Sequence, residues 1–265
     1  MVALLTQKDF RGVRELPFCY LCGKGFLPAD ETNRDHVPPQ KLFAETDRQP
    51  ALILKTHKAC NSAQSTADNK IGQLLKLKRG KIPSNPSDRI LEFALFPRQG
   101  MGAVMNVAID EVVWRWIRGL HAALYRQPFP PGPRVGALVT PFPRAHASGN
   151  DVRVEDIKVQ HLKCVAIIKA NRARNNLDRI HSNNGNFVYE SVWVQAQADG
   201  VRSWICVFAM NLYDWKVLGT AAPLLGRGCA GWYRLPQGEK IAAGTTEIIS
   251  RIQVPNYEPL NPFGG

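Results

Sequence analysis

Apolar residues recur at three- and four-residue steps in two stretches of the chain, and this spacing predicts two helices. The first covers residues 62–78, where Gln and Lys lie outside the apolar face. The second covers residues 101–125 and ends before the prolines of residues 128–133, which cannot continue a helix. The apolar positions are Ala63, Ala67, Ile71, Leu74, Leu75 and Leu77 in the first helix, and Val104, Val107, Ala108, Val112, Trp116, Leu120 and Leu124 in the second.

Beyond residue 133 the pattern changes to short runs rich in Val, Ile, Phe and Trp, which favour strands. These runs cover residues 134–140, 162–170, 187–197 and 201–210, and residues 215–220 are a further candidate. Asp199 and Gly200 lie between two of the runs, and this pair is typical of a hairpin turn. The C-terminal part is therefore predicted to be an α+β domain built on an antiparallel sheet.

The first 62 residues contain many Gly and Pro residues, which indicate knuckles, short strands and loops. A second cluster of turn-forming residues, Pro-Ser-Asn-Pro-Ser at 83–87, indicates a linker. We therefore expect three parts, which are a small module over residues 1–82, a linker over residues 83–100 and an α+β domain over residues 101–265.

The composition is that of a globular protein, with 45% hydrophobic and 21% charged residues among 265. The net charge of +12 favours a polyanionic partner, most simply nucleic acid, although many basic proteins bind none. The start of the chain lacks a secretory pattern, and no uncharged apolar stretch is long enough to cross a membrane. These features favour a cytoplasmic location.

Four residues near the start have the types and spacing of zinc ligands. Cys19 and Cys22 are separated by two residues, and so are His57 and Cys60. Each pair can reach one tetrahedral zinc ion, and such a staple would stabilise a small module with few large apolar groups. The alternative is that the two cysteines are incidental and His57 lies on the surface. The other three cysteines, Cys164, Cys206 and Cys229, have the surroundings of small buried hydrophobes.

Between the two Cys/His pairs lies the segment Asp35-His36-Val37-Pro38-Pro39, and directly after Cys60 comes Asn61. With these elements in this order, residues 17–78 resemble the HNH endonucleases, also called ββα-metal or His-Me finger nucleases. The resemblance implies a zinc-held ββα-metal fold and metal-dependent cleavage of phosphodiester bonds. It further implies that Asn61, on the helix, completes the metal site. The family's middle Asn corresponds to Ala51, and Gln49 is a nearby amide that could replace it.

The chemistry of these residues agrees with such a site. His36 can take a proton from water, because the pKa of an imidazole lies near physiological pH. Asp35 is a hard oxygen donor suited to Mg²⁺ or Mn²⁺, and one divalent ion can stabilise the charge that develops during hydrolysis. Asp68, seven residues beyond Asn61, is either an outer ligand or a solvated surface residue. The alternative for Asp35 and His36 is a buried pair that only stabilises the fold.

The leading hypothesis is an HNH-type endonuclease that acts on DNA. Arg34, Lys41 and Lys58 are candidates for contacts with the phosphate backbone. One alternative is a non-catalytic zinc module that binds nucleic acid or protein, and another is a nuclease directed at RNA. The C-terminal domain, with a basic loop predicted at residues 171–179, would target the nuclease, bind a partner or sense a small ligand. Phage defence and processing of a phage's own genome are both open.

Overall fold

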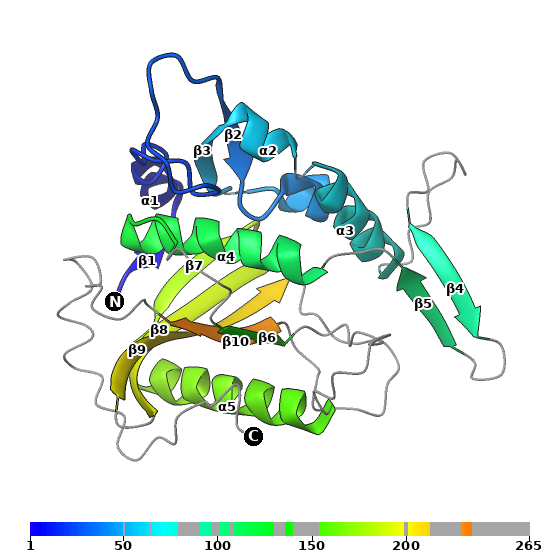
Figure 1. Ribbon diagram of the computed structural model, residues 1–265, viewed down its shortest axis with the longest axis vertical. Coiled ribbons are helices and arrows are strands. Elements are labelled where there is room, and N and C mark those ends of the chain that lie inside the picture. Colours follow the sequence, from blue (N-terminus) through cyan, green and yellow to red (C-terminus); the bar gives the residue numbers. More distant parts are fainter. Residues whose placement is uncertain are drawn as a thin grey trace.

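The computed structural model describes residues 1–49, 51–63, 65–78, 91–96, 101–105, 109–129, 136–139, 154–198, 201–212 and 229–234. These residues form a mixed α+β structure around a six-stranded sheet (Figure 1). The strand order is β1(Ala3–Leu4), β7(Asp178–Ser182), β8(Phe187–Ala198), β9(Val201–Leu212), β10(Cys229–Arg234) and β6(Gly136–Val139). Neighbouring strands are antiparallel except β1 and β7, which run parallel. The sheet is therefore mixed, because the predicted antiparallel arrangement of the C-terminal strands is joined by the N-terminal strand β1 in a parallel pair.

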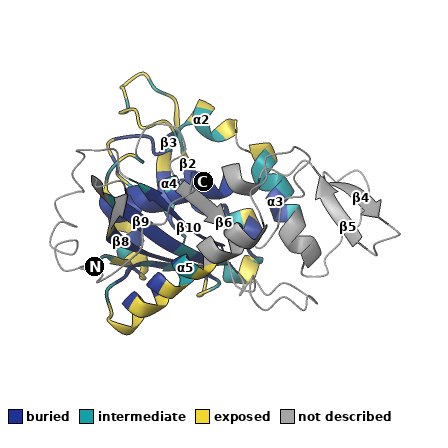
Figure 2. Cartoon of the chain, turned by 60° about the horizontal axis from the view of Figure 1, so that its bottom comes forward, coloured by how far each residue is buried: buried dark blue, intermediate teal, exposed yellow. Residues whose placement is uncertain are grey.

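Each face of the sheet is covered by one long helix (Figure 1). Helix α4(Ile109–Tyr125) packs on one face, where Trp193 of β8 and Phe208 of β9 belong to the same hydrophobic cluster as the helix. Helix α5(Val154–Ala173) packs on the other face, against Val192 and Val207. Alternate residues of a strand point to opposite faces, and the central residues 192–194 of β8 and 205–208 of β9 are accordingly buried and apolar on both sides. Figure 2 shows the buried interior of the sheet.

The strands predicted at residues 134–140, 187–197 and 201–210 are confirmed as β6, β8 and β9, and Ala198 pairs with Val201 as a hairpin requires. The strand predicted at residues 162–170 is wrong, because this stretch lies inside α5. Cys164, Ile167 and Ile168 follow helical spacing and pack on the sheet, while Lys169 is exposed. A short apolar run does not distinguish a strand from a buried helix face. The strand predicted at residues 215–220 lies outside the described residues.

The helix predicted for residues 101–125 is confirmed only from Ile109 onward. Residues 101–105 instead form the strand β5(Met101–Met105), which pairs with β4(Glu92–Phe96) inside the stretch predicted as a linker. The hairpin lies beyond α3(Ser65–Lys78), away from the large sheet (Figure 1). The strand that pairs with β5 lies at residues 92–96, before the predicted helix. The helical periodicity of residues 104–124 therefore gave no sign of this pairing.

The N-terminal part contains a β-hairpin followed by a helix. Strand β2(Thr32–His36) pairs with β3(Ile53–His57), and α2(Lys58–Ser62) follows directly. The predicted helix at residues 62–78 is confirmed as α3, and α2 brings the helical region forward to Lys58. The remaining elements are α1(Gln7–Gly12), η1(Gln40–Leu42) and η2(Glu45–Asp47). Thr6 and Asp9 cap α1 reciprocally, a signal that the loop prediction for residues 1–62 overlooked.

Helix α4 lies between this N-terminal part and the sheet (Figure 1). The helix comes close to this part at Gly119, where an added Cβ would lie 2.8 Å from Val37 Cγ1 and 3.2 Å from Tyr20 Cε2. One hydrophobic cluster accordingly contains Phe10 and Leu54 of the N-terminal part, Trp116 of α4 and Phe208 of the sheet. Described residues of the predicted module and of the predicted C-terminal domain therefore share one core, and the division into these two domains stays a prediction. Among the described residues, no helix is long and apolar enough to span a membrane.

Candidate functional site

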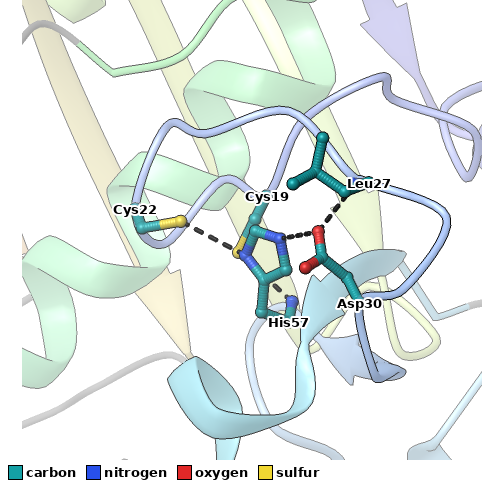
Figure 3. Close-up of polar contacts among 5 residues, drawn as sticks. All are labelled: Cys19, Cys22, Leu27, Asp30 and His57. Atoms are coloured by element: carbon teal, nitrogen blue, oxygen red, sulfur yellow. Dashed lines mark hydrogen bonds and ion pairs between the residues drawn. The ribbon is translucent and has the colours of Figure 1, made fainter.

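Cys19, Cys22, His57 and Cys60 come together in space. Their ligand atoms all lie within 4.8 Å of one another, although the two halves of the set are 35 residues or more apart along the chain. The Cys22 Sγ and His57 Nδ1 atoms are 3.4 Å apart (Figure 3). Three sulfur atoms and one imidazole nitrogen around a single point match the ligands of a structural zinc site. The predicted Cys₃His cluster is thus formed, and it could hold a structural zinc ion.

Local backbone structure explains how each half of the cluster is presented. The first half is a tight knuckle in which the Gly23 amide donates to the Cys19 carbonyl at 2.7 Å and the Cys19 amide donates to the Lys24 carbonyl at 2.9 Å. Gly23 has a φ of +77°, a conformation that favours glycine. The second half lies at a chain reversal, since His57 ends β3 and Cys60 is on α2. The His57 amide also points at Cys19 Sγ, 3.4 Å away (Figure 3).

Asp30 is a member of this site that the sequence reasoning missed. Its Oδ2 atom lies 3.1 Å from His57 Nε2 and accepts a hydrogen bond from the Leu27 amide at 2.7 Å (Figure 3). The bond from the Leu27 amide, together with the bond to His57, lowers the pKa of the Asp30 carboxyl. A carboxylate on the far ring nitrogen fixes the tautomer that leaves Nδ1 free to bind a metal. The only sequence signal was an acidic residue in the loop between the two Cys/His pairs.

The cysteine side chains of the cluster lie close enough together to shift one another's pKa. Burial, followed by the negative charges of the Cys19 and Cys22 sulfurs, raises the pKa of the Cys60 thiol to about 11. Burial also acts to raise the pKa of Cys22, but hydrogen bonds from the Lys24 amide and from His57 outweigh it, and the pKa falls. The positive charge of a bound zinc ion would offset this repulsion and would stabilise the deprotonated thiols.

Asp30→Asn should weaken zinc binding by roughly 10-fold or more, because loss of the carboxylate partner of a ligating histidine typically costs 10–100-fold in metal affinity. Competition with a chromogenic chelator measures the zinc affinity. Glu31→Gln is the matched control, since it removes the same charge at the next position. The Glu31 side chain pairs with Lys58 and not with His57. Equal zinc affinity in Asp30→Asn and Glu31→Gln would contradict the assigned role of Asp30.

Asp35, on strand β2 of the hairpin, is buried, with 6% of the residue exposed. Tyr20, which lies between Cys19 and Cys22, donates a hydrogen bond from its hydroxyl to Asp35 Oδ2 at 2.5 Å. Burial, reinforced by the charge of Asp35, raises the pKa of Tyr20 well above its ordinary value, so the hydroxyl keeps its proton. The candidate metal ligand is therefore connected directly to the zinc knuckle.

Asp68 does not lie on a solvated helix surface. It forms an ion pair with Arg115 of α4, and only 13% of the Asp68 side chain and 5% of the Arg115 side chain are exposed. Burial raises the pKa of Asp68 despite the opposing effect of Arg115, and the charge of Asp35 acts in the same direction as burial. Tyr20, Asp35, Asp68 and Arg115 thus form a buried polar group between the N-terminal part and α4.

His36 ends β2 and is half-buried. Burial, with a contribution from the charge of Arg14, lowers the pKa of His36 below its ordinary value, although the neighbouring Asp35 opposes this shift. The imidazole is therefore neutral at physiological pH and able to accept a proton. Successive strand residues point to opposite sides, so Asp35 and His36 are directed to different faces of the hairpin.

Asn61 lies on α2, beside β2, and its Nδ2 atom donates to Asn33 Oδ1 at 3.3 Å. Thr56 of β3 donates to the same oxygen at 2.7 Å. Asn33 and Asp35 are two residues apart on β2 and therefore on one face of the strand. The Asn61 side-chain oxygen takes no part in the bond to Asn33.

The three predicted phosphate-binding residues differ in their surroundings. Arg34 is exposed on β2. Lys41 Nζ donates to Asn69 Oδ1 at 3.1 Å. Lys58 Nζ lies 3.0 Å from Glu31 Oε2, in a pair that is mostly exposed. A neighbouring carboxylate reduces the attraction of a lysine for phosphate, so Arg34 and Lys41 are the better candidates.

The segment between β2 and β3 is held by the turn that joins β7 to β8. The Asn184 amide donates to the Gln49 carbonyl, and Asn184 Nδ2 donates to the Thr46 carbonyl at 2.8 Å. This tie comes from the C-terminal part of the chain and acts near Ala51, where the resembling family has its Asn. The prediction of a loop at residues 171–179 is corrected, because residues 171–173 end α5 and residues 178–179 begin β7.

Comparisons of the chain with protein-family models, with curated proteins and with solved structures found no match. The resemblance to a known family therefore rests on the motif residues alone.

Proposed function

We propose that this protein is an HNH-type endonuclease that hydrolyses phosphodiester bonds in DNA and uses a divalent cation. His36 would activate the attacking water, and Asp35 and Asn61 would hold Mg²⁺ or Mn²⁺. The Cys₃His cluster would hold zinc for structure, and Arg34 and Lys41 would contact the phosphate backbone.

The observation that carries the proposal is the assembly of the motif residues around one hairpin and helix. The Cys₃His cluster joins the end of β3 and the start of α2 to the Cys19–Cys22 knuckle. Asp35 and His36 lie at the end of the paired strand β2, and Asn61 lies on α2 next to Asn33 of that strand. A neutral imidazole and two oxygen donors, carried by one hairpin and its following helix, are the kinds of group that metal-assisted hydrolysis requires.

A second candidate function is a zinc-held module that binds nucleic acid or protein without catalysis. It is favoured by the engagement of both candidate ligands with protein groups, since Asp35 accepts a bond from Tyr20 and Asn61 donates to Asn33. Among the described residues, the Cys₃His set is the only group of three or more His, Cys, Asp or Glu residues placed to hold a metal ion.

Cleavage assays separate the two candidates. We expect the purified full chain to nick supercoiled plasmid when Mg²⁺ or Mn²⁺ is added, and to remain inactive with EDTA. An RNA of matched length, tested in the same buffer, decides the nucleic-acid class, because the metal site alone does not distinguish the sugar. Absence of cleavage with every divalent cation, in protein that retains its zinc, would leave the binding module as the function.

A further inference from the structure

We infer that Tyr20 is a positioning residue that couples the zinc cluster to Asp35, the candidate ligand of the catalytic cation. This inference rests on the proposed nuclease function and adds a residue outside the Asp-His-Asn set. Tyr20 lies between two zinc ligands in the chain, and its hydroxyl donates to Asp35 Oδ2 at 2.5 Å. One side chain thus joins the Cys19–Cys22 knuckle to the candidate ligand Asp35.

The position of the Tyr20 ring is fixed from two directions. The knuckle fixes its backbone through the bonds between Cys19, Gly23 and Lys24. Helix α4 fixes its ring, because the α4 backbone at Gly119 approaches so closely that a Cβ there would lie 3.2 Å from Tyr20 Cε2. In addition, Arg118 Nη1 of α4 donates to the Leu21 carbonyl at 3.3 Å. The hydroxyl is therefore held in one place for as long as the knuckle is ordered.

The bond from Tyr20 holds the Asp35 carboxylate near a second charged group. It is buried close to the Asp68–Arg115 ion pair, and it interacts electrostatically with both members of the pair. The Nε and Nη1 groups of Arg115 are buried and have no hydrogen-bond partner among the described residues. A carboxylate free to rotate would be drawn toward this guanidinium. The bond from Tyr20 engages Oδ2, and the carboxylate has a second oxygen, Oδ1, to offer to a cation.

The consequence is a dependence of one metal site on the other. A hydrogen-bonded partner that orients a metal ligand typically contributes 10–100-fold to metal affinity. Because zinc orders the knuckle that carries Tyr20, zinc binding prepares Asp35 for the divalent ion. Loss of the Tyr20 hydroxyl should disconnect the two sites while it leaves the zinc ligands in place.

The test is a titration of the zinc-loaded full chain with Mn²⁺, in which electron paramagnetic resonance reports the free ion. We expect Tyr20→Phe to raise the Kd for Mn²⁺ by roughly 10-fold, to keep about one zinc ion per chain and to raise the Mn²⁺ concentration for half-maximal cleavage. Tyr125→Phe is the matched control, since the Tyr125 hydroxyl donates to another buried carboxylate, Asp178, at 2.9 Å. It should leave the Kd for Mn²⁺ unchanged.

Asp35→Ala distinguishes a failure of this inference from a failure of the proposed function. If Asp35→Ala abolishes Mn²⁺ binding but Tyr20→Phe binds Mn²⁺ as the wild type does, the role of Tyr20 is overturned and the nuclease proposal stands. If Asp35→Ala binds Mn²⁺ normally, Asp35 is not a ligand and both fail. If Tyr20→Phe loses its zinc, Tyr20 serves the cluster itself, and the positioning role is again overturned.

Discussion

Replacing Cys22 with serine should release the zinc ion and unfold the N-terminal part of the protein. A hydroxyl is a poor substitute for a thiolate, and in zinc-finger peptides the apparent free energy of binding a structural zinc ion is about 10–16 kcal/mol. This is comparable to the whole stability of a domain, roughly 5–15 kcal/mol. Elemental analysis should show a fall from about one zinc ion per chain to almost none.

The loss should also reach helix α4, because α4 packs on Tyr20 and Val37 and its Arg118 bonds to Leu21 of the knuckle. We expect the midpoint of thermal unfolding, measured by circular dichroism, to fall by about 10 °C or more, since each kcal/mol shifts it by about 2–4 °C at this size. Cys164→Ala is the control, because Cys164 is buried between α5 and the sheet. It should keep the full zinc content, and unaltered zinc in Cys22→Ser would disprove the zinc assignment.

Replacing His36 with alanine should reduce DNA cleavage by about 10³-fold, within the range of 10²–10⁴ that a general base contributes. The half-buried imidazole is neutral at physiological pH, so the variant loses a group already in its reactive protonation state. Initial rates of plasmid nicking at saturating Mg²⁺ measure the effect. Mn²⁺ binding should be largely retained, because His36 is assigned to the water and not to the cation.

His181→Ala is the matched control for His36. His181 is a half-buried histidine of β7 whose pKa is likewise lowered by burial, but it lies on the large sheet. Its replacement should leave the cleavage rate close to that of the wild type. If His36→Ala cleaved as fast as His181→Ala, the assignment of His36 as the base would fail, whatever the metal dependence.

The spacing of residues along the chain predicted the structure correctly where that structure depends on residues close together in sequence. The two Cys/His pairs have two-residue separations, and each pair is brought together by its own short segment, a knuckle in one case and a strand end with α2 in the other. The helical repeat of residues 112–124 likewise survives in α4, because that face packs on the sheet. The runs that became β8 and β9 are rich in Val, Phe and Trp and are separated by Asp199 and Gly200, and their pairing as a hairpin followed this local pattern.

The spacing of residues gave wrong predictions where contacts with residues far away in sequence determine the local structure. The apolar residues of 162–170 fit either a strand or one face of a helix. In the structure they belong to a helix whose apolar face packs on the sheet. Residues 101–105 became a strand because residues 92–96 pair with them. Asp68 looked solvated from its position on α3, and only its contact with Arg115, 47 residues later, buries it.

The sequence by itself determined the ligand set for zinc and the adjacent Asp35 and His36, because residue type and short-range spacing define both. The tertiary structure decided what surrounds them. It placed Asp30 on the far nitrogen of His57, Tyr20 on Asp35, and α4 against the knuckle. These contacts join segments far apart in the chain, and they form only when burial of the shared core brings α4 and the hairpin together.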